Sequence, residues 1–260
     1  GLAVMIGDGA CSYVSICFGK NRQEDADCAV GSAVTLSVLV GVLVAGFYAV
    51  FQTPILLLFG ATEANLAYAK EYFTYITIGI PIYVFGQAIN PIIRSDGSPR
   101  FAMASMLAGA IANCILDPIA IFVLHWGVMG AALSTMLSRA LQCVAILWFH
   151  HRPGQVIVLN HYASIRPDFG LIRTILRIGI PTGVENGMFQ FGKLVIQSTV
   201  ATLPTSEIAA QAVVNTLEYF TSMPSMAVGL GLVTVAGQCM GAGRPKEARR
   251  YSLEFTGISE

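Results

Sequence analysis

The feature that most constrains this chain is a series of apolar runs, each about as long as the hydrocarbon core of a bilayer is thick. A transmembrane helix needs about 20 predominantly apolar residues, and runs of that length recur along the whole sequence. Charged residues make up only 12% of the chain, against about 25% in a soluble domain. Runs rich in Ala, Leu and Gly favour helices, which satisfy their own backbone hydrogen bonds in lipid. The sequence therefore predicts an all-α integral membrane protein, a polytopic helical bundle.

The predicted spans alternate across the membrane, and the basic residues identify its cytoplasmic side. An eighth span begins near Tyr251, after seven that cover residues 1–19, 29–51, 71–93, 101–124, 127–149, 171–201 and 208–240. Of the 15 Lys and Arg residues, twelve lie in connections on one side or at the span ends beside them, Lys70 lies on the other, and Arg139 and Lys193 lie farther within spans. Cytoplasmic loops carry the excess of Lys and Arg, so the first side is predicted to be cytoplasmic. A net charge of zero argues against a nucleic-acid partner.

Two stretches of the sequence, six spans apart, repeat one pattern of residues. The pattern is Gly7, Gly9, Cys17, Gly19, Arg22 and Ala26, and it recurs 222 positions later, without a gap, at Gly229, Gly231, Cys239, Gly241, Arg244 and Ala248. An even number of spans between the copies gives both the same orientation. This predicts a parallel repeat about an axis along the membrane normal, with about twelve spans in the complete protein.

The repeat divides the chain into two predicted lobes. Residues 1–149 form an N-terminal lobe that holds the second to sixth helices and lacks the first. Residues 150–170 form a cytoplasmic linker, and residues 171–260 begin a C-terminal lobe with the seventh helix, the eighth and the start of the ninth.

Polar residues within the spans are the candidate functional residues, because a charge at the centre of a helix costs about 2.5–3.5 kcal/mol on insertion scales. The fourth and fifth spans form a hairpin, in which Asp117 is predicted level with Thr135, and Asn113 with Arg139 one turn deeper. Asn113 and Asp117 share one face of their helix. A carboxylate, an amide and a hydroxyl together suit a hard cation or a proton. The alternative is that Asp117 pairs with Arg139 as a structural link.

The sixth and seventh spans each carry a polar stripe, and Lys193 and Glu218 are predicted to form a structural ion pair between them. The stripe residues with helical spacing are Asn186, Gln190, Lys193 and Gln197 on one span, and Gln211, Asn215, Glu218 and Ser222 on the other. Such stripes face a water-filled cavity or a partner helix. We expect a substrate cavity lined by Glu185, Asn186, Gln190, Asn215 and Glu218. Alternatively, Glu185 extends to the membrane interface.

The motifs of common enzymes and cofactor sites are missing from the sequence. It contains no Walker loop, no GxSxG, no HExxH and no metal-ligand spacing of Cys or His. The stretch Gly7-Asp8-Gly9 lacks the preceding strand and following helix of a nucleotide-binding loop. We therefore expect neither an enzyme nor a bound cofactor or structural metal.

Six further motifs are distributed along essentially the whole chain. They are Cys17-Phe18-Gly19-Lys20, Asn90-Pro91-Ile92-Ile93-Arg94-Ser95-Asp96-Gly97-Ser98-Pro99-Arg100, Asn113-Cys114-Ile115-Leu116-Asp117-Pro118, Gly127-Val128-Met129-Gly130-Ala131-Ala132-Leu133-Ser134-Thr135, Gly179-Ile180-Pro181 and Gly237-Gln238-Cys239-Met240-Gly241-Ala242-Gly243. Together they resemble the multidrug and toxic compound extrusion (MATE) family. The resemblance implies a two-lobed antiporter of the cell membrane, monomeric and without a cofactor. It would exchange Na+ or H+ for amphipathic or cationic drugs by alternating access.

The resemblance also implies a coupling site in the N-terminal lobe. Asn113 and Asp117 match the family's cation-binding positions on the fifth helix, and Thr135 matches the position on the sixth. Tyr72 and Tyr75 are the candidates for a tyrosine of the fourth helix that joins the site. The family's aspartate on the first helix falls outside this chain.

Two other functions are retained as alternatives. A flippase of lipid-linked oligosaccharides, in the same superfamily, would hold its pyrophosphate substrate in a more basic cavity, whereas the intramembrane cations here are Arg139 and Lys193. A structural membrane subunit, of a different class, would not need polar stripes in both lobes. A sodium site in the C-terminal lobe is not supported, because the chain has Phe189-Gln190 where some relatives have a glutamate.

Overall fold

The computed structural model describes residues 1–58, 66–150, 168–200 and 205–259, and nearly all of this part of the chain is helical. The elements are α1 (Leu2–Gly19), α2 (Gln23–Val50), α3 (Gln52–Leu58), α4 (Leu66–Ser95), α5 (Pro99–Pro118), η1 (Ile119–Val123), α6 (Gly127–His150), α7 (Phe169–Val200), α8 (Thr205–Gly241) and α9 (Pro245–Ser259). No strand occurs among these described residues, so the all-helical prediction is confirmed.

The described part of each predicted span is helical apart from single residues at its ends, and three differences are informative. First, α2 begins earlier than predicted, because Glu24 and Asp25 occupy its first turn, where carboxylates interact favourably with the helix dipole. Second, the short helix α3 was not predicted. Third, six helices of the described chain are long and apolar enough to cross a membrane, namely α1, α2, α4, α5 with η1, α6 and α8. The helix α7 is not among them, because charged and amide side chains interrupt its apolar surface.

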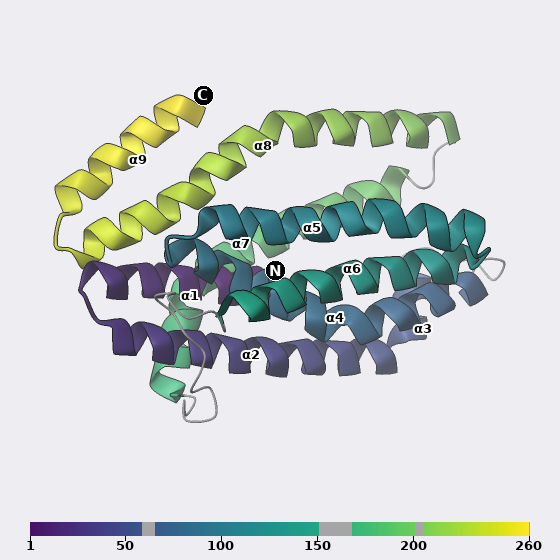
Figure 1. Ribbon diagram of the computed structural model, residues 1–260. Helices are drawn as coiled ribbons and strands as arrows, with labels where there is room; N and C mark the ends of the chain where they lie inside the picture. The colour runs from purple at the N-terminus through teal and green to yellow at the C-terminus, as the bar shows by residue number, and fades with distance from the viewer. Residues whose placement is uncertain (59–65, 151–167, 201–204, 260) are drawn as a thin grey trace.

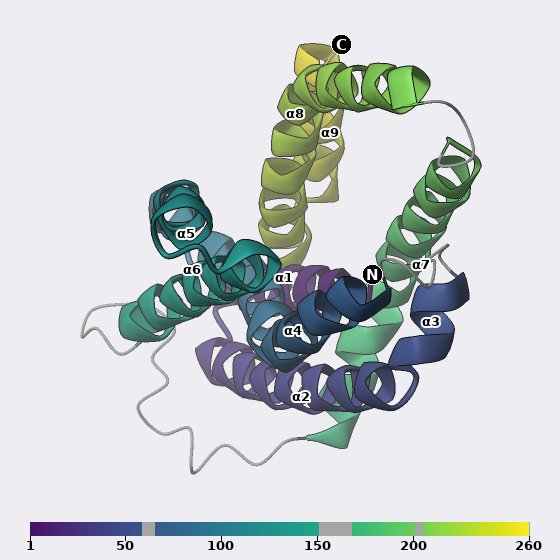
Figure 2. The same cartoon turned by 90° about the vertical axis from the view of Figure 1, so that its right-hand side faces the viewer.

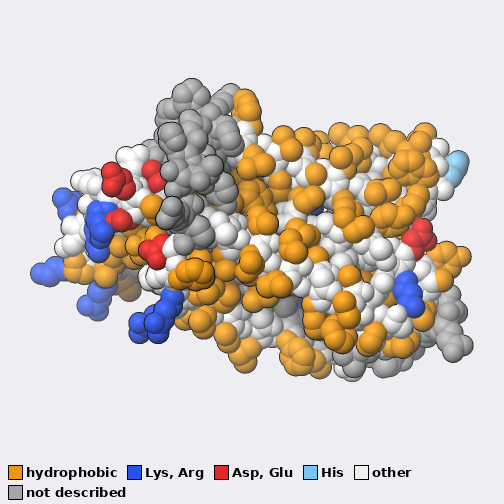
Figure 3. All heavy atoms as spheres, turned by 90° about the horizontal axis from the view of Figure 1, so that it is seen from below, with side chains coloured by type: hydrophobic (Ala, Val, Ile, Leu, Met, Phe, Trp, Pro, Cys, Tyr) orange, Lys and Arg blue, Asp and Glu red, His pale blue; other side chains and the backbone are white. Residues whose placement is uncertain are grey.

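The helices lie side by side with their turns at two ends of the molecule (Figure 1). The turns from α1 to α2, from α4 to α5 and from α8 to α9 lie at one end, and those from α2 to α3 and from η1 to α6 lie at the other. Lys and Arg side chains gather at the first end, and hydrophobic side chains cover most of the remaining visible face (Figure 3). This distribution agrees with the predicted topology, in which the first end is cytoplasmic.

The core of the N-terminal lobe lies where α1, α2 and α4 meet. Ile6 of α1, Val30 of α2 and Ile89 of α4 are fully buried there. On the outer faces, large apolar side chains such as Leu43 and Ile111 are exposed. Exposed apolar residues on long helices are expected where lipid is the solvent.

The helices α7 and α8 both pack against α1 (Figure 2). The first crossing is at Gly9 and Gly179, where the Met5 carbonyl leaves no room for a side chain at Gly179. The second is at Gly19 and Gly241, where the two backbones are similarly close. Small residues allow this approach between membrane helices. The helix α1 therefore makes most of the contacts between the two predicted lobes, and α2 also contacts α7.

The contact between α1 and α8, called here the α1–α8 seam, is reciprocal. A side chain at Gly19 would overlap the Gln238 carbonyl, and one at Gly241 would overlap the Ile16 carbonyl. Ile16 and Gln238 occupy equivalent positions of the predicted repeat, as do the two glycines. Reciprocal contacts of this kind are the signature of a two-fold axis, which here runs between two parallel helices.

The turns that follow the seam helices also match. Asn21 and Gly243, at equivalent positions, have φ angles of 56° and 72°, a left-handed conformation that ends a helix. The next residue in each copy forms an ion pair three positions along the chain, Arg22–Asp25 and Arg244–Glu247. The parallel repeat predicted from the sequence is thus present in three dimensions. Most of the predicted linker 150–170 lies outside the described residues.

Candidate functional site

Asn113 and Asp117 lie one turn apart on α5 and contact each other. The amide nitrogen Nδ2 of Asn113 donates to Oδ1 of Asp117 at 3.3 Å, and both side chains are partly buried. This bond uses one amide proton and one carboxylate oxygen, so the amide oxygen and the second carboxylate oxygen retain their acceptor capacity. The two residues therefore form a compact group of oxygen ligands, called here the carboxylate–amide pair.

The packing of α5 against α6 brings Thr135 close in depth to this pair. A side chain at Gly130 would come within 3.0 Å of the Ala120 carbonyl, and one at Gly109 within 3.3 Å of the Ser138 carbonyl. These two contacts define the register of the hairpin. Interpolating between them places Thr135 near the level of Asn113, about one turn deeper than Asp117.

This register corrects the prediction that Thr135 is level with Asp117 and Arg139 with Asn113. The element η1 is a π-helix, in which the amide of Leu124 bonds five residues back at 2.9 Å. A π-helix places more residues in each turn than an α-helix. Asp117 is therefore nearer the turn than α-helical spacing predicts. As a result Thr135 lies near the level of Asn113, and Arg139 lies deeper than either member of the pair.

Arg139 does not pair with Asp117 in the structure. Its guanidinium carbon lies 5.0 Å from the centroid of the Tyr83 ring on α4, a cation–π contact. None of the ion pairs between described residues includes Arg139. The prediction of a structural ion pair at Arg139 is therefore wrong, because a neighbouring ring face stabilises the guanidinium instead. Arg139 consequently does not neutralise the Asp117 carboxylate.

The two candidate tyrosines of α4 lie outward of the carboxylate–amide pair. The Tyr75 hydroxyl donates to Sδ of Met129 at 3.3 Å, and Tyr72 is 40% exposed. Met129 precedes Thr135 by more than a turn on α6, toward the outer end of the molecule. The structure therefore bonds Tyr75 to a thioether and not to the carboxylate.

We expect Tyr75→Phe to change ion-driven efflux by less than about twofold, because the substitution removes only a bond to a weak acceptor. The measurement is the initial rate of dye efflux by the full-length protein, normalised to its amount in the membrane. Thr135→Ala, which removes a hydroxyl at the level of the pair, is the comparison and should lower the rate more. A larger loss in Tyr75→Phe than in Thr135→Ala would assign Tyr75 to the cation site.

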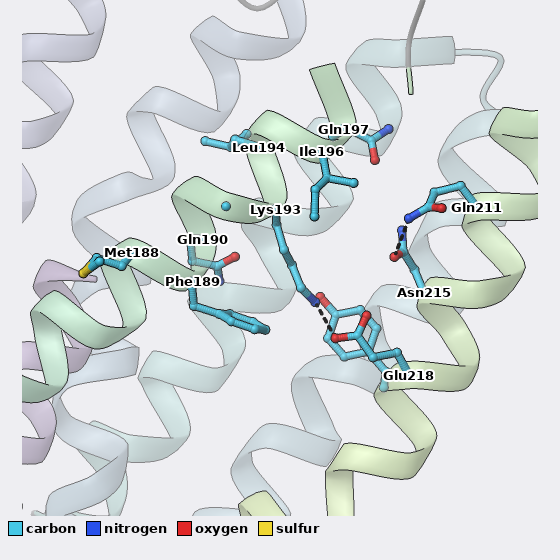
Figure 4. A pocket seen from close by; sticks show the side chains of 12 residues that line it. Met188, Phe189, Gln190, Lys193, Leu194, Ile196, Gln197, Gln211, Asn215 and Glu218 are labelled. Atoms are coloured by element: carbon cyan, nitrogen blue, oxygen red, sulfur yellow. Dashed lines mark hydrogen bonds and ion pairs between the residues drawn. The ribbon is translucent and has the colours of Figure 1, made fainter. Parts of the chain in front are cut away.

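A cavity of about 670 Å³ lies between α7 and α8 (Figure 4). Three of the five predicted cavity residues line it, namely Gln190, Asn215 and Glu218. Nζ of Lys193 lies 3.7 Å from Oε1 of Glu218, so the structure contains the ion pair that antiparallel packing predicted. Polar groups of both stripes therefore face one another across this space, called here the α7–α8 cavity.

Glu185 and Asn186 do not line the α7–α8 cavity, contrary to the prediction. Glu185 is exposed, and Nδ2 of Asn186 donates to the Thr182 carbonyl at 3.0 Å. Both residues precede the cavity along α7, where the neighbouring Gly183 packs against Met5 of α1. At this point of α7 the adjacent helix is α1 and not α8.

Two aromatic residues of the cavity were missed in the sequence reasoning. Nζ of Lys193 lies 4.8 Å from the ring centroid of Phe189 and 4.2 Å from that of Tyr219. Phe189 is one helical turn before Lys193, and Tyr219 follows Glu218 directly. The first spacing is a signal that could have been read from the sequence, whereas the second contact depends on how α8 is placed.

Comparison with known proteins identifies the relatives of this chain. The model of the MatE family matches residues 2–119 and 181–259. The FAD transporter of Shewanella oneidensis is 26% identical over 267 residues, which cover 98% of this chain and 58% of that protein. The multidrug export protein MepA of Staphylococcus aureus is 25% identical over 260 residues, 99% of this chain and 57% of MepA. The chain thus spans a little more than half the length of these relatives.

A solved structure shares the fold. It is the outward-facing conformation of a multidrug resistance MATE family transporter of the MOP superfamily, with a TM-score of 0.88 and 24% identity over 99% of this chain and 57% of that one. This likeness confirms the helical membrane fold. The two stretches matched by the family model together cover more than half of the residues. The chain therefore belongs to the MatE family, the multidrug and toxic compound extrusion transporters.

Proposed function

We propose that the protein is a secondary active exporter that exchanges Na+ or H+ for amphipathic organic cations. The observation that carries this proposal is the carboxylate–amide pair Asn113–Asp117 with Thr135 near the level of Asn113. Carboxylate, amide and hydroxyl oxygens suit a hard cation, and a carboxylate also accepts a proton. Family membership supports a transport role, as does the export function in the name of MepA.

Export then follows if the protein has two conformations, one stabilised by the bound cation and the other by the bound cargo. In this structure the α1–α8 seam is closed near the cytoplasmic end, and the α7–α8 cavity lies farther from that end. A cation that enters from outside and binds Asp117 stabilises the conformation from which cargo has left. Cargo that enters from the cytoplasm stabilises the other. Coupling requires each ligand to discriminate between the two states.

The test is a reconstitution of the full-length protein in proteoliposomes that contain a fluorescent organic cation. An imposed Na+ or proton gradient should drive dye movement against the dye gradient, and collapsing the imposed gradient with an ionophore should stop it. Dye movement that is independent of both gradients would contradict the proposed exchange. Testing the two gradients separately identifies the coupling ion.

The α1–α8 seam allows the two lobes to be locked with a single substitution. Sγ of Cys11 lies 3.9 Å from Oγ1 of Thr234 across the seam. We expect Thr234→Cys to form a disulfide with the native Cys11 under oxidation and to reduce export to background, because the cytoplasmic end must open to admit cargo. A reductant should restore export. The crosslink is verified by mass spectrometry of the tryptic peptides.

The control for this crosslink is Thr234→Cys combined with Cys11→Ser, which retains the new thiol but removes its partner. Oxidation should leave export by this double variant unchanged. Wild-type export rates in the crosslinked single variant would show that the seam does not open during transport.

A further inference from the structure

The Lys193 ammonium occupies a small site within the α7–α8 cavity that is composed like a receptor for organic cations. Nζ lies 4.8 Å from the ring centroid of Phe189, 4.2 Å from that of Tyr219 and 3.7 Å from the carboxylate of Glu218. Figure 4 shows Lys193 extending from α7 toward Glu218 on α8. Two ring faces and one carboxylate thus surround a single positive charge.

Aromatic faces attract cations through the ring quadrupole, and aromatic cages that recognise quaternary ammonium ligands use this interaction. A carboxylate beside the rings adds charge complementarity. An anion is repelled by the negative potential of the ring faces, and the one basic group among the described residues that line the cavity is already paired with Glu218. The charge pattern of this site therefore selects a cation.

Within the described part of the chain, the site is open to the cavity. Phe189 and Tyr219 are 50% and 53% exposed, and the Glu218 side chain is 49% exposed. The cavity volume of about 670 Å³ lies within the range of roughly 300–1,000 Å³ that is typical of small-molecule sites. Lys193 is joined to α7 by a flexible four-carbon stem, so its ammonium can leave the site while the helices remain in place.

We propose that Lys193 is an internal competitor of the cargo, and that a monovalent amphipathic organic cation binds by displacing its ammonium from Phe189, Tyr219 and Glu218. This inference rests on the proposed function for the identity of the ligand as cargo. When the ligand is bound, its charge is balanced by Glu218 and the Lys193 ammonium is solvated in the cavity. When the ligand leaves, Lys193 returns and keeps Glu218 paired. The competition lowers affinity for cargo, which favours its release.

The test measures equilibrium binding of tetraphenylphosphonium to the purified full-length protein in detergent, without an ion gradient. We expect Lys193→Met to tighten binding about fivefold, because the competing cation is removed while the stem volume is kept. Glu218→Gln should weaken binding by about tenfold or more. Lys193→Arg, which keeps a competing cation, should remain within about twofold of wild type.

Matched controls separate this effect from general changes in charge. Lys70→Met and Glu207→Gln remove the same charges at positions that do not line the cavity, and neither should alter tetraphenylphosphonium binding. Each variant is first checked for a monodisperse peak in size-exclusion chromatography. Tetraphenylborate, an anion of the same shape, is measured in parallel and should bind more weakly than the cation.

Two results would overturn the inference and assign Lys193 to anion recognition. One is weaker tetraphenylphosphonium binding by Lys193→Met than by wild type, and the other is tetraphenylborate binding by wild type that is lost in Lys193→Met. Unchanged binding in Lys193→Met would overturn it as well. The proposed exchange is judged separately, by gradient-driven efflux. If the wild-type protein shows ion-driven export but Lys193→Met binds tetraphenylphosphonium as wild type does, only this inference fails. If Lys193→Met binds tetraphenylphosphonium more tightly but the wild-type protein shows no ion-driven export, only the proposed exchange fails.

Discussion

Replacing Asp117 with Asn is expected to lower ion-driven efflux by at least about tenfold, because a partly buried charged ligand of the cation is lost. Asn is nearly isosteric with Asp and can still accept the bond from Asn113 that is 3.3 Å long in the structure. The fold should therefore be retained while the charge is removed. The amide can neither take up a proton nor balance a sodium ion, so either form of coupling fails.

The measurement is gradient-driven dye efflux from proteoliposomes, with the Na+ and proton gradients applied separately. Asp168→Asn is the matched control, because Asp168 is an exposed carboxylate that lies before α7 and away from the carboxylate–amide pair. Tetraphenylphosphonium binding to Asp117→Asn should persist, since the α7–α8 cavity is in the other lobe. Unchanged ion-dependent efflux in Asp117→Asn would exclude this carboxylate as the coupling group.

Replacing Gly241 with Leu is expected to destabilise the protein by about 3 kcal/mol or more, at the upper end of the cost of overpacking. A side chain at this position would overlap the Ile16 carbonyl and crowd the Cα of Gly19. The obstructing atoms belong to the backbone of α1, which cannot move aside as a flexible side chain would. The seam then cannot close at the cytoplasmic end.

Thermal unfolding of the purified variant and the labelling rate of Cys11 measure the two consequences. Cys11 is 2% exposed beside the seam, so a water-soluble maleimide should react with it much faster when the seam is open. Gly46→Leu is the control, because Gly46 is also helical and has no neighbouring atom where its side chain would extend. Equal melting temperatures for the two variants would show that the seam does not require glycine.

The helices and the repeat follow from local features of the sequence. Apolar runs longer than the thickness of a bilayer favour helices whatever surrounds them, and the described part of each predicted span is helical apart from single residues at its ends. The spacing of Asn113 and Asp117 likewise puts both on one helical face, and the structure joins them. Such predictions succeed because they depend on a single helix, whose geometry is nearly constant.

Predictions that involved two helices were less reliable, because they assumed regular geometry at the turn or the crossing. The depth of Thr135 was misjudged because η1 is π-helical. Arg139 contacts Tyr83, a residue whose proximity no spacing in the sequence reveals. Glu185 does not line the predicted cavity, since α7 at that point packs against α1.

The sequence alone therefore determined where the long apolar helices lie and the parallel repeat, and it predicts their orientation, since apolar length, the distribution of basic residues and the offset of 222 are properties of the linear chain. Apart from the Lys193–Glu218 ion pair, which the sequence predicted, only the tertiary structure decided which side chains meet across helices. It placed Lys193 between the rings of Phe189 and Tyr219, and it brought equivalent glycines of the two copies together at the seam. The physical reason is that such contacts depend on register, crossing position and rotamer, which packing sets and local composition does not.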